Sequence, residues 1–152
     1  MRRVLLSLAV AFVATFSAAG IAAAATADEE AAFINAYKTA FAAKDAAALS
    51  ALLYPKGDPM AMDFYGQMMT AEMADGTLTG IELKALSADD VANAAAIQDM
   101  PSGKMQLLPK PYKKLVLTID TKTDTTTSSS NSEVFVADVD GKIVISVPAP
   151  AK

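Results

Sequence analysis

The sequence predicts an α+β domain in which N-terminal helices pack on a curved antiparallel sheet. Apolar residues recur at helical spacing from about residue 30 to residue 74. Beyond Gly76 the apolar period falls to about two, which is typical of half-buried strands. Helices followed by strands are typical of α+β domains, whose helices cover one face of an antiparallel sheet. The sheet is expected to curl, because its other face also carries apolar residues.

The first 27 residues are expected to be a secretory signal peptide. Arg2 and Arg3 precede an apolar stretch over residues 4–25, and the small residues around Thr26 suit cleavage after Ala27. This segment indicates a periplasmic or secreted protein. The alternative is an uncleaved N-terminal anchor, since about 20 apolar residues can span a bilayer.

Cleavage after Ala27 leaves 152 − 27 = 125 residues, enough for one domain over residues 28–147 with a flexible tail over residues 148–152. The signal removes two of 13 basic residues and none of 17 acidic ones, so the mature charge is 11 − 17 = −6. Such a charge argues against a nucleic-acid partner and against docking to anionic lipid. No stable membrane insertion is expected after cleavage.

The chain contains no Cys and no His. A disulfide, a thiolate metal site and a Ser-His-Asp triad are therefore excluded, and the usual neutral-pH general base is missing. No calcium-loop spacing and no phosphate-binding glycine loop occurs. We therefore expect no cofactor, no metal site and no catalytic residues. A Cys-free secreted chain of this size favours a bacterial periplasm.

Three helices are predicted. The first covers residues 30–43, where Phe33, Tyr37 and Phe41 share one face. Lys44 and Asp45 interrupt it, and Asp45 is expected to be the N-cap of a second helix over 46–53. A run of turn formers follows at 54–59. The third helix, over 60–74, ends at Asp75-Gly76.

Strands are predicted after Gly76. The first covers 77–87 with a bulge near Gly80, and residues 88–100 form a short helix or an irregular connection. A strand over 104–108 is expected at a sheet edge, because prolines follow it. Further strand signals cover residues 112–121 and 133–147, the latter a hairpin turning at Asp140-Gly141. The polar run over 121–132 is either a loop or the ends of a long hairpin.

The order of helices and strands, together with the stretch FINAYKTAFAAKDAAALSALLY and the later MDFYGQMM, resembles the nuclear transport factor two-like superfamily, including ketosteroid isomerase-like and SnoaL-like proteins. The resemblance implies a cystatin-like cone that closes around a ligand, and a homodimer formed through the open sheet face.

In the isomerase-like branch a first-helix tyrosine, eight residues before the break, donates a hydrogen bond to the substrate oxygen, and Tyr37 occupies that position before Asp45. An alternative function is therefore a ketosteroid isomerase- or dehydratase-like enzyme that uses Tyr37. That branch also needs a carboxylate base on a strand, which is missing here. Of the nearest acids, Asp58 lies in a turn and is expected to be a cap or solvated. Asp63 is expected in the first turn of the third helix, where the helix dipole favours an acid. The alternative to a catalytic role is that Tyr37 packs in the core with its hydroxyl at the rim.

Five methionines lie between residues 60 and 73. Of these, Met62, Met69 and Met73 share a helical face with Tyr65. Thioethers are soft ligands, so a Cu(I)-binding periplasmic protein is a further alternative. Without His or Cys beside them, they are better explained as flexible fillers of a core or pocket wall.

The favoured prediction is a non-catalytic, secreted or periplasmic domain that binds an apolar small molecule or mediates a protein contact. Its pocket is expected to be lined by side chains from the first and third helices: Phe33, Tyr37, Phe41, Met62, Tyr65 and Met69.

Overall fold

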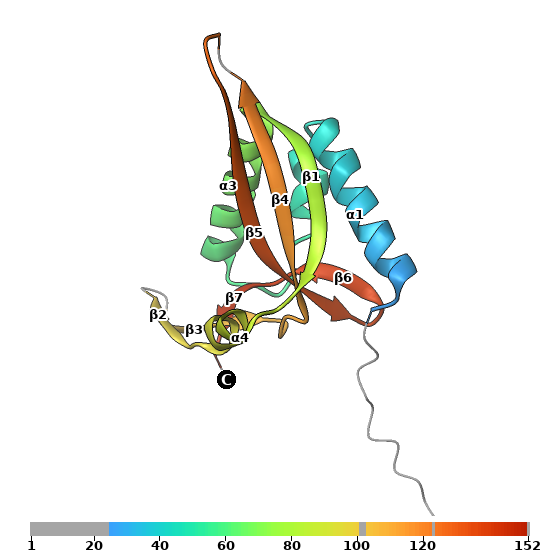
Figure 1. The fold of residues 1–152 in the computed structure, drawn as a ribbon. Coiled ribbons are helices and arrows are strands. Elements are labelled where there is room, and N and C mark those ends of the chain that lie inside the picture. The colour runs from blue at the N-terminus through green and yellow to red at the C-terminus, as the bar shows by residue number, and fades with distance from the viewer. Residues whose placement is uncertain (1–24, 101–102, 123, 152) are drawn as a thin grey trace, which may run out of the picture.

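A computed structural model describes residues 25–100, 103–122 and 124–151 of the chain, so most of the expected signal peptide lies outside the described residues. The fold is α+β, as the sequence predicts (Figure 1). The helices are α1 (Ala27–Ala42), α2 (Ala46–Ser50), α3 (Pro59–Asp75) and α4 (Ala88–Ala95).

The strands form two antiparallel sheets. The larger sheet has the order β1-β4-β5-β6, from β1 (Gly76–Ala85), β4 (Lys113–Lys122), β5 (Thr127–Val139) and β6 (Lys142–Ile145). The smaller has the order β2-β3-β7, from β2 (Gln98–Met100), β3 (Gly103–Leu108) and β7 (Val147–Pro150).

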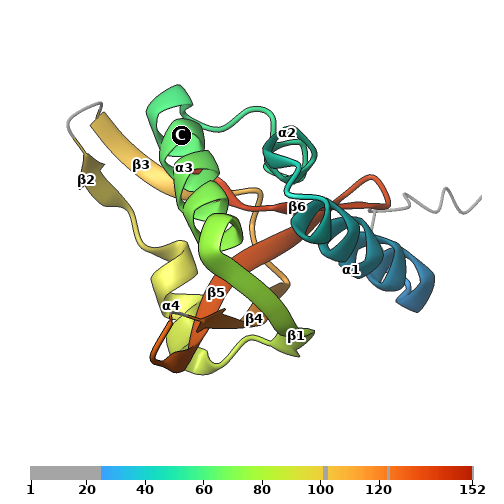
Figure 2. The same ribbon diagram turned by 90° about the horizontal axis from the view of Figure 1, so that it is seen from above.

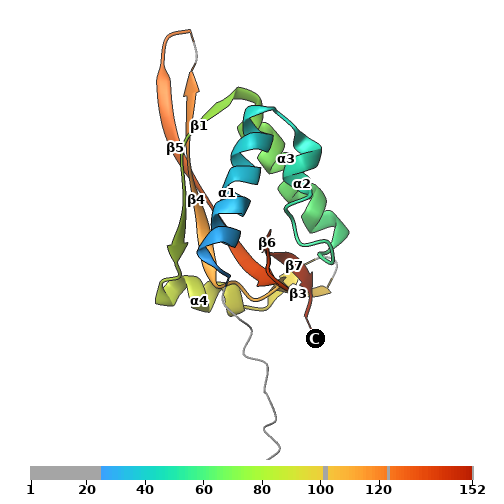
Figure 3. The same cartoon turned by 90° about the vertical axis from the view of Figure 1, so that its right-hand side faces the viewer.

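Helices α1, α2 and α3 lie on one side of the long strands β1, β4 and β5 (Figure 3). Seen from above, α1 and α3 diverge over this face, and α2 lies close to α1 (Figure 2). The space between helices and sheet is filled by a single cluster of buried side chains, in which Leu115, Val136 and Ile145 are fully buried. Smaller elements, namely α4 and the second sheet, close the lower end of the domain (Figure 1).

Several local signals are confirmed. Asp45 is the N-cap of α2, its Oδ1 accepting a hydrogen bond from the Ala48 N–H at 2.9 Å. The pairing of β1 with β4 shifts between Leu78 and Gly80, which is the expected bulge. Asp140 and Gly141 both have positive φ, as a tight hairpin turn requires. The polar run belongs to a long hairpin, because β5 pairs with β4 from Thr127 onwards.

Three expectations need correction. Residues 148–151 are not a free tail, because β7 extends to Pro150 and pairs with β3. Strand β3 lies between β2 and β7 and not at an edge, since both prolines follow the strand and leave its ladder intact. Residues 88–100 hold both a helix, α4, and a strand, β2.

In the ranges 25–100, 103–122 and 124–151, no helix combines the length and apolar character needed to span a bilayer.

Candidate functional site

The six residues predicted to line one pocket lie in different environments. Phe33, Tyr37, Phe41 and Met69 are core residues, each less than 5% exposed. Met62 and Tyr65 are half-buried and pack against the same cluster from α3. Met62 lines a shallow groove beside Leu53, whereas Tyr65 lines a cleft between α3 and β2. Four of the six therefore belong to the core, and Tyr65 lines the cleft between α3 and β2.

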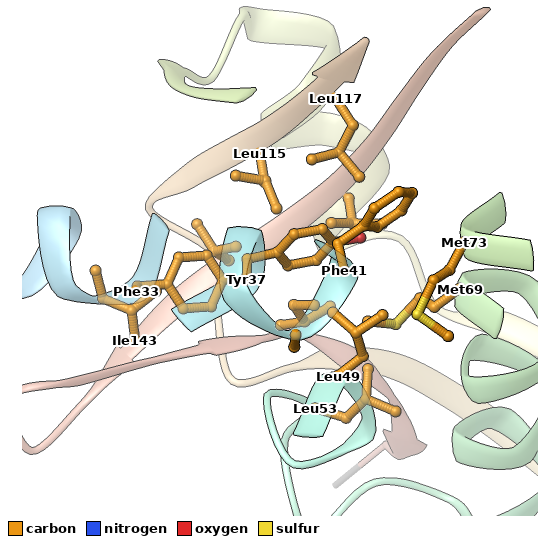
Figure 4. Packing of buried hydrophobic residues seen from close by; sticks show 14 of the residues in the cluster. Phe33, Tyr37, Phe41, Leu49, Leu53, Met69, Met73, Leu115, Leu117 and Ile143 are labelled. Atoms are coloured by element: carbon orange, nitrogen blue, oxygen red, sulfur yellow. The ribbon is translucent and has the colours of Figure 1, made fainter. Parts of the chain in front are cut away.

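Tyr37 lies in the middle of this core. Its ring stacks on Phe41, with 6.3 Å between the ring centroids, and faces Leu115 of β4 (Figure 4). Burial, and to a smaller extent the nearby Glu72 carboxylate, raise the pKa of the Tyr37 phenol. The side chain is 1% exposed, so its hydroxyl is withdrawn from solvent. These surroundings are those of a packing residue.

The carboxylates considered beside Tyr37 have other environments. Asp58 is the N-cap of α3, its Oδ1 accepting from the Met60 and Ala61 N–H groups at 3.1 Å each. Asp63 is exposed and lies just beyond the first helical turn, because α3 begins at Pro59. Met69 and Met73 point from α3 into the core beside Leu49 (Figure 4). In the described part of the chain no group of three or more His, Cys, Asp or Glu side chains could hold a metal ion.

A largely apolar cleft of about 340 Å³ lies between the first turns of α3 and strand β2. Met60 and Phe64, one helical turn apart, are 64% and 63% exposed and form one wall. Met100 of β2, itself 40% exposed, forms the opposite wall with Gln98. Pro148 of β7 also lines it. We call this the α3–β2 cleft.

Local hydrogen bonds position both walls. The Asp58 N–H donates to the Pro148 carbonyl at 2.8 Å, which ties the start of α3 to strand β7. The Asp58 side chain then caps α3 and fixes Met60 in its first turn. The opposite wall is held by antiparallel pairing of Gln98 with Met105 and of Met100 with Gly103. The cleft thus lies where the start of α3 meets strands β2 and β7.

Few polar groups line the cleft. Its polar groups are the Gln98 amide and the Tyr65 phenol, whose pKa is raised by burial, together with the Asp58 carboxylate that caps α3. A smaller hollow of about 170 Å³ shares Tyr65, Gln98 and Pro148 with the cleft and continues toward α4. Exposed apolar walls with few polar groups are typical of sites that bind apolar ligands.

Sequence reasoning placed Tyr65 at a pocket but missed Met60, Phe64 and Met100. The available signal was that Met60 and Phe64 lie on the face of α3 opposite the buried Met69 and Met73. When a helix carries apolar residues on both faces, each face is expected to contact another element or a ligand. Met100 could not be assigned, because no strand was predicted at its position.

Comparisons with known proteins identify no family. No family model matches the chain, and no curated protein matches it. Among solved structures, the helical cell shape determining protein Pgp2 from Campylobacter jejuni is similar over 77% of this chain, with a TM-score of 0.41 and 11% sequence identity. This chain spans 38% of that chain's length.

Proposed function

We propose that this protein is a non-catalytic, periplasmic or secreted binding domain whose α3–β2 cleft takes an apolar small molecule. The proposal rests chiefly on the exposure of Met60 and Phe64 beside a cleft of about 340 Å³. That volume lies within the range of about 300–1,000 Å³ typical of ligand pockets. The periplasmic or secreted location rests on the basic and apolar pattern of residues 1–27.

Burial accounts for the expected affinity. Covering an exposed aromatic or Met side chain is worth roughly 1.5–3 kcal/mol each, so two or three such contacts can hold a small apolar molecule. Methionine side chains adapt to ligands of different shape, which suits a cleft of broad specificity. The resemblance to the nuclear transport factor two-like superfamily belongs to the same proposal, because it implies a domain that binds a ligand.

A fluorescence titration with N-phenyl-1-naphthylamine, an uncharged apolar probe, tests the proposal. The wild-type mature protein is expected to enhance the probe's emission with saturation. Phe64→Ser is expected to raise the dissociation constant about tenfold, because it removes the aromatic side chain from one wall of the cleft. The matched control is Val91→Ser on α4, where Val91 is 49% exposed and does not line the cleft. Equal affinity in all three proteins, or no saturable enhancement, would contradict the proposal.

A further inference from the structure

A second hollow lies on the other side of the domain, between the end of α1 and the first half of β1. Its volume is about 520 Å³. Helix α1 runs beside β1 in two views of the molecule (Figures 1 and 2). We call it the α1–β1 groove. Its lining residues lie between 38 and 44 and between 76 and 81, so it shares none with the α3–β2 cleft.

Both charged side chains that line the α1–β1 groove are lysines, Lys38 and Lys44. The whole chain has a formal charge of −4, so two cations without a carboxylate among the lining residues stand out against their surroundings. Lys44 is held in place, because its Nζ donates to the Ala74 carbonyl in the last turn of α3 at 2.6 Å. An ammonium has three N–H donors, so this bond leaves two for a ligand.

Capping of α3 explains Lys44 in structural terms, since cations stabilise helix C-termini. It does not explain Lys38, which lies on α1 and lines the same groove. Both lysines line the groove, so a single anion bound there could contact both ammonium groups.

The floor of the α1–β1 groove is apolar and depends on the bulge in β1. In a regular strand Leu78 and Ile81 would point to opposite faces. The register shift between Leu78 and Gly80 inserts Thr79 as an extra residue, so both side chains pack toward the helices. Together with Phe41, which is 4% exposed, they form an aliphatic and aromatic surface below the lysines.

Hydroxyl groups border this floor. Thr77 and Thr79 are exposed and line the groove. The Thr79 hydroxyl donates to the Thr118 carbonyl at 3.2 Å, which leaves its oxygen free to accept a further hydrogen bond. Strand β1 is an edge of the larger sheet within the described residues, so the groove is open on that side.

We propose that the α1–β1 groove binds an amphipathic carboxylate, with the carboxylate between Lys38 and Lys44 and the apolar body over Phe41, Leu78 and Ile81. An apolar molecule without charge would leave the two ammonium groups partly desolvated, and a small inorganic anion would leave the apolar floor exposed to water. This inference is independent of the proposed function, because it concerns a different ligand and a different surface.

The test uses octanoate and, as a probe of opposite charge, octylammonium, which carries a straight eight-carbon chain as well. In ¹H–¹⁵N correlation spectra of the mature protein, octanoate is expected to shift the amides of residues 77–81 with saturation. Octylammonium is expected to leave them unchanged. Equal shifts with both probes would overturn the proposal, since charge would then play no part. Octanoate shifts confined to residues 60–65 and 98–100 would assign the probe to the α3–β2 cleft and would also overturn it.

Substitutions in the α1–β1 groove test the contribution of its charge and the need for its open space separately. The double substitution Lys38→Gln, Lys44→Gln is expected to weaken octanoate binding about tenfold, because it removes two charge-assisted hydrogen bonds. Lys56→Gln, at an exposed lysine outside the groove, is the matched control and should bind like wild type. Ala42→Trp, at an exposed position of α1 that lines the groove, should block binding while both lysines remain. Wild-type affinity in Ala42→Trp would contradict the proposed place of the apolar body.

Discussion

The Nζ atom of Lys113 lies 2.6 Å from Oε1 of Glu30, and this ion pair joins β4 to the first turn of α1. The Tyr112 hydroxyl donates to the same oxygen at 3.1 Å. The Lys113 and Glu30 side chains are only 31% and 19% exposed, so solvent screens the pair less than a surface pair. The start of α1 is thereby fixed against the strand that supplies the centre of the core.

Glu30→Gln is expected to lower the free energy of unfolding by about 1–2 kcal/mol, because it leaves the half-buried Lys113 without its counter-charge. Glu82→Gln is the matched control. Its partner Lys84 is also 2.6 Å away, but the two side chains are 60% and 49% exposed, so its loss should stay within about 0.5 kcal/mol. Urea denaturation at neutral pH measures both. Equal losses would show that the Glu30 pair contributes no more than a surface pair.

The raised pKa values of two tyrosines predict that the folded protein loses stability at alkaline pH. Burial, with Glu72, raises the pKa of Tyr37, and burial, with Glu30, raises the pKa of Tyr112. Above about pH 10 the unfolded chain loses these protons while the folded chain keeps them. The unfolded state then binds fewer protons, so the free energy of unfolding must fall as the pH rises above about 10.

The double variant Tyr37→Phe, Tyr112→Phe should therefore show a shallower fall than wild type between pH 9.5 and 11, in urea titrations at fixed temperature. Because Tyr37 serves as a packing residue, the single variant Tyr37→Phe should also fold normally at pH 7. An alkaline slope identical to that of wild type would mean that the phenols do not carry this dependence.

The N-cap of α1, Thr26, lies next to the expected cleavage position after Ala27. The Thr26 Oγ1 accepts from the Glu29 N–H at 3.3 Å, and Glu29 Oε2 accepts from the Thr26 N–H at 2.6 Å. A chain that begins at Thr26 keeps this capping box, whereas cleavage after Ala27 removes it. Residues 26–152 should be more stable than residues 28–152 by about 1 kcal/mol. Thr26→Ala in the longer chain should reproduce the loss, and identical midpoints for the two chains would refute the prediction.

Gly57 allows the loop between α2 and α3 to approach β7 closely. A Cβ at this position would overlap with Cγ2 of Val147 and lie 3.1 Å from Cγ of Met62. Gly57→Ala is expected to destabilise the fold by about 1–3 kcal/mol. Gly66→Ala, inside α3 with its nearest neighbour Ser50 Oγ at 3.4 Å, should be neutral or stabilising by up to about 1 kcal/mol. Thermal unfolding of both variants checks the difference. Two equal shifts would contradict the close approach at Gly57.

Much of the fold could be predicted because its signals are local. The Asp45 cap, the bulge near Gly80 and the Asp140-Gly141 turn depend on neighbouring residues alone, and all three are confirmed. The second sheet could not be predicted, because β7 is held by pairing with β3, about 40 residues earlier in the chain. A Pro- and Ala-rich segment such as 147–150 has little strand propensity of its own, so its conformation is set by tertiary contacts.

The site was harder to predict than the fold. Helical periodicity correctly assigned Phe33, Tyr37 and Phe41 to one face of α1, but periodicity does not distinguish a packed core from a ligand pocket. The difference depends on how closely Leu115 and Ile145 of the sheet approach that face, which is a long-range property. The exposed walls of the α3–β2 cleft were missed for the same reason, since β2 reaches α3 only in the folded chain.

The most direct measurement is a ¹H–¹⁵N correlation titration of the mature protein with N-phenyl-1-naphthylamine. The account predicts saturable shifts of the amides in residues 60–65 and 98–100, on the two walls of the α3–β2 cleft, with residues 33–41 unchanged. Shifts centred on residues 33–41 would mean that the helices open around a ligand in the core. That result, or no saturable shift at all, would contradict the central claim.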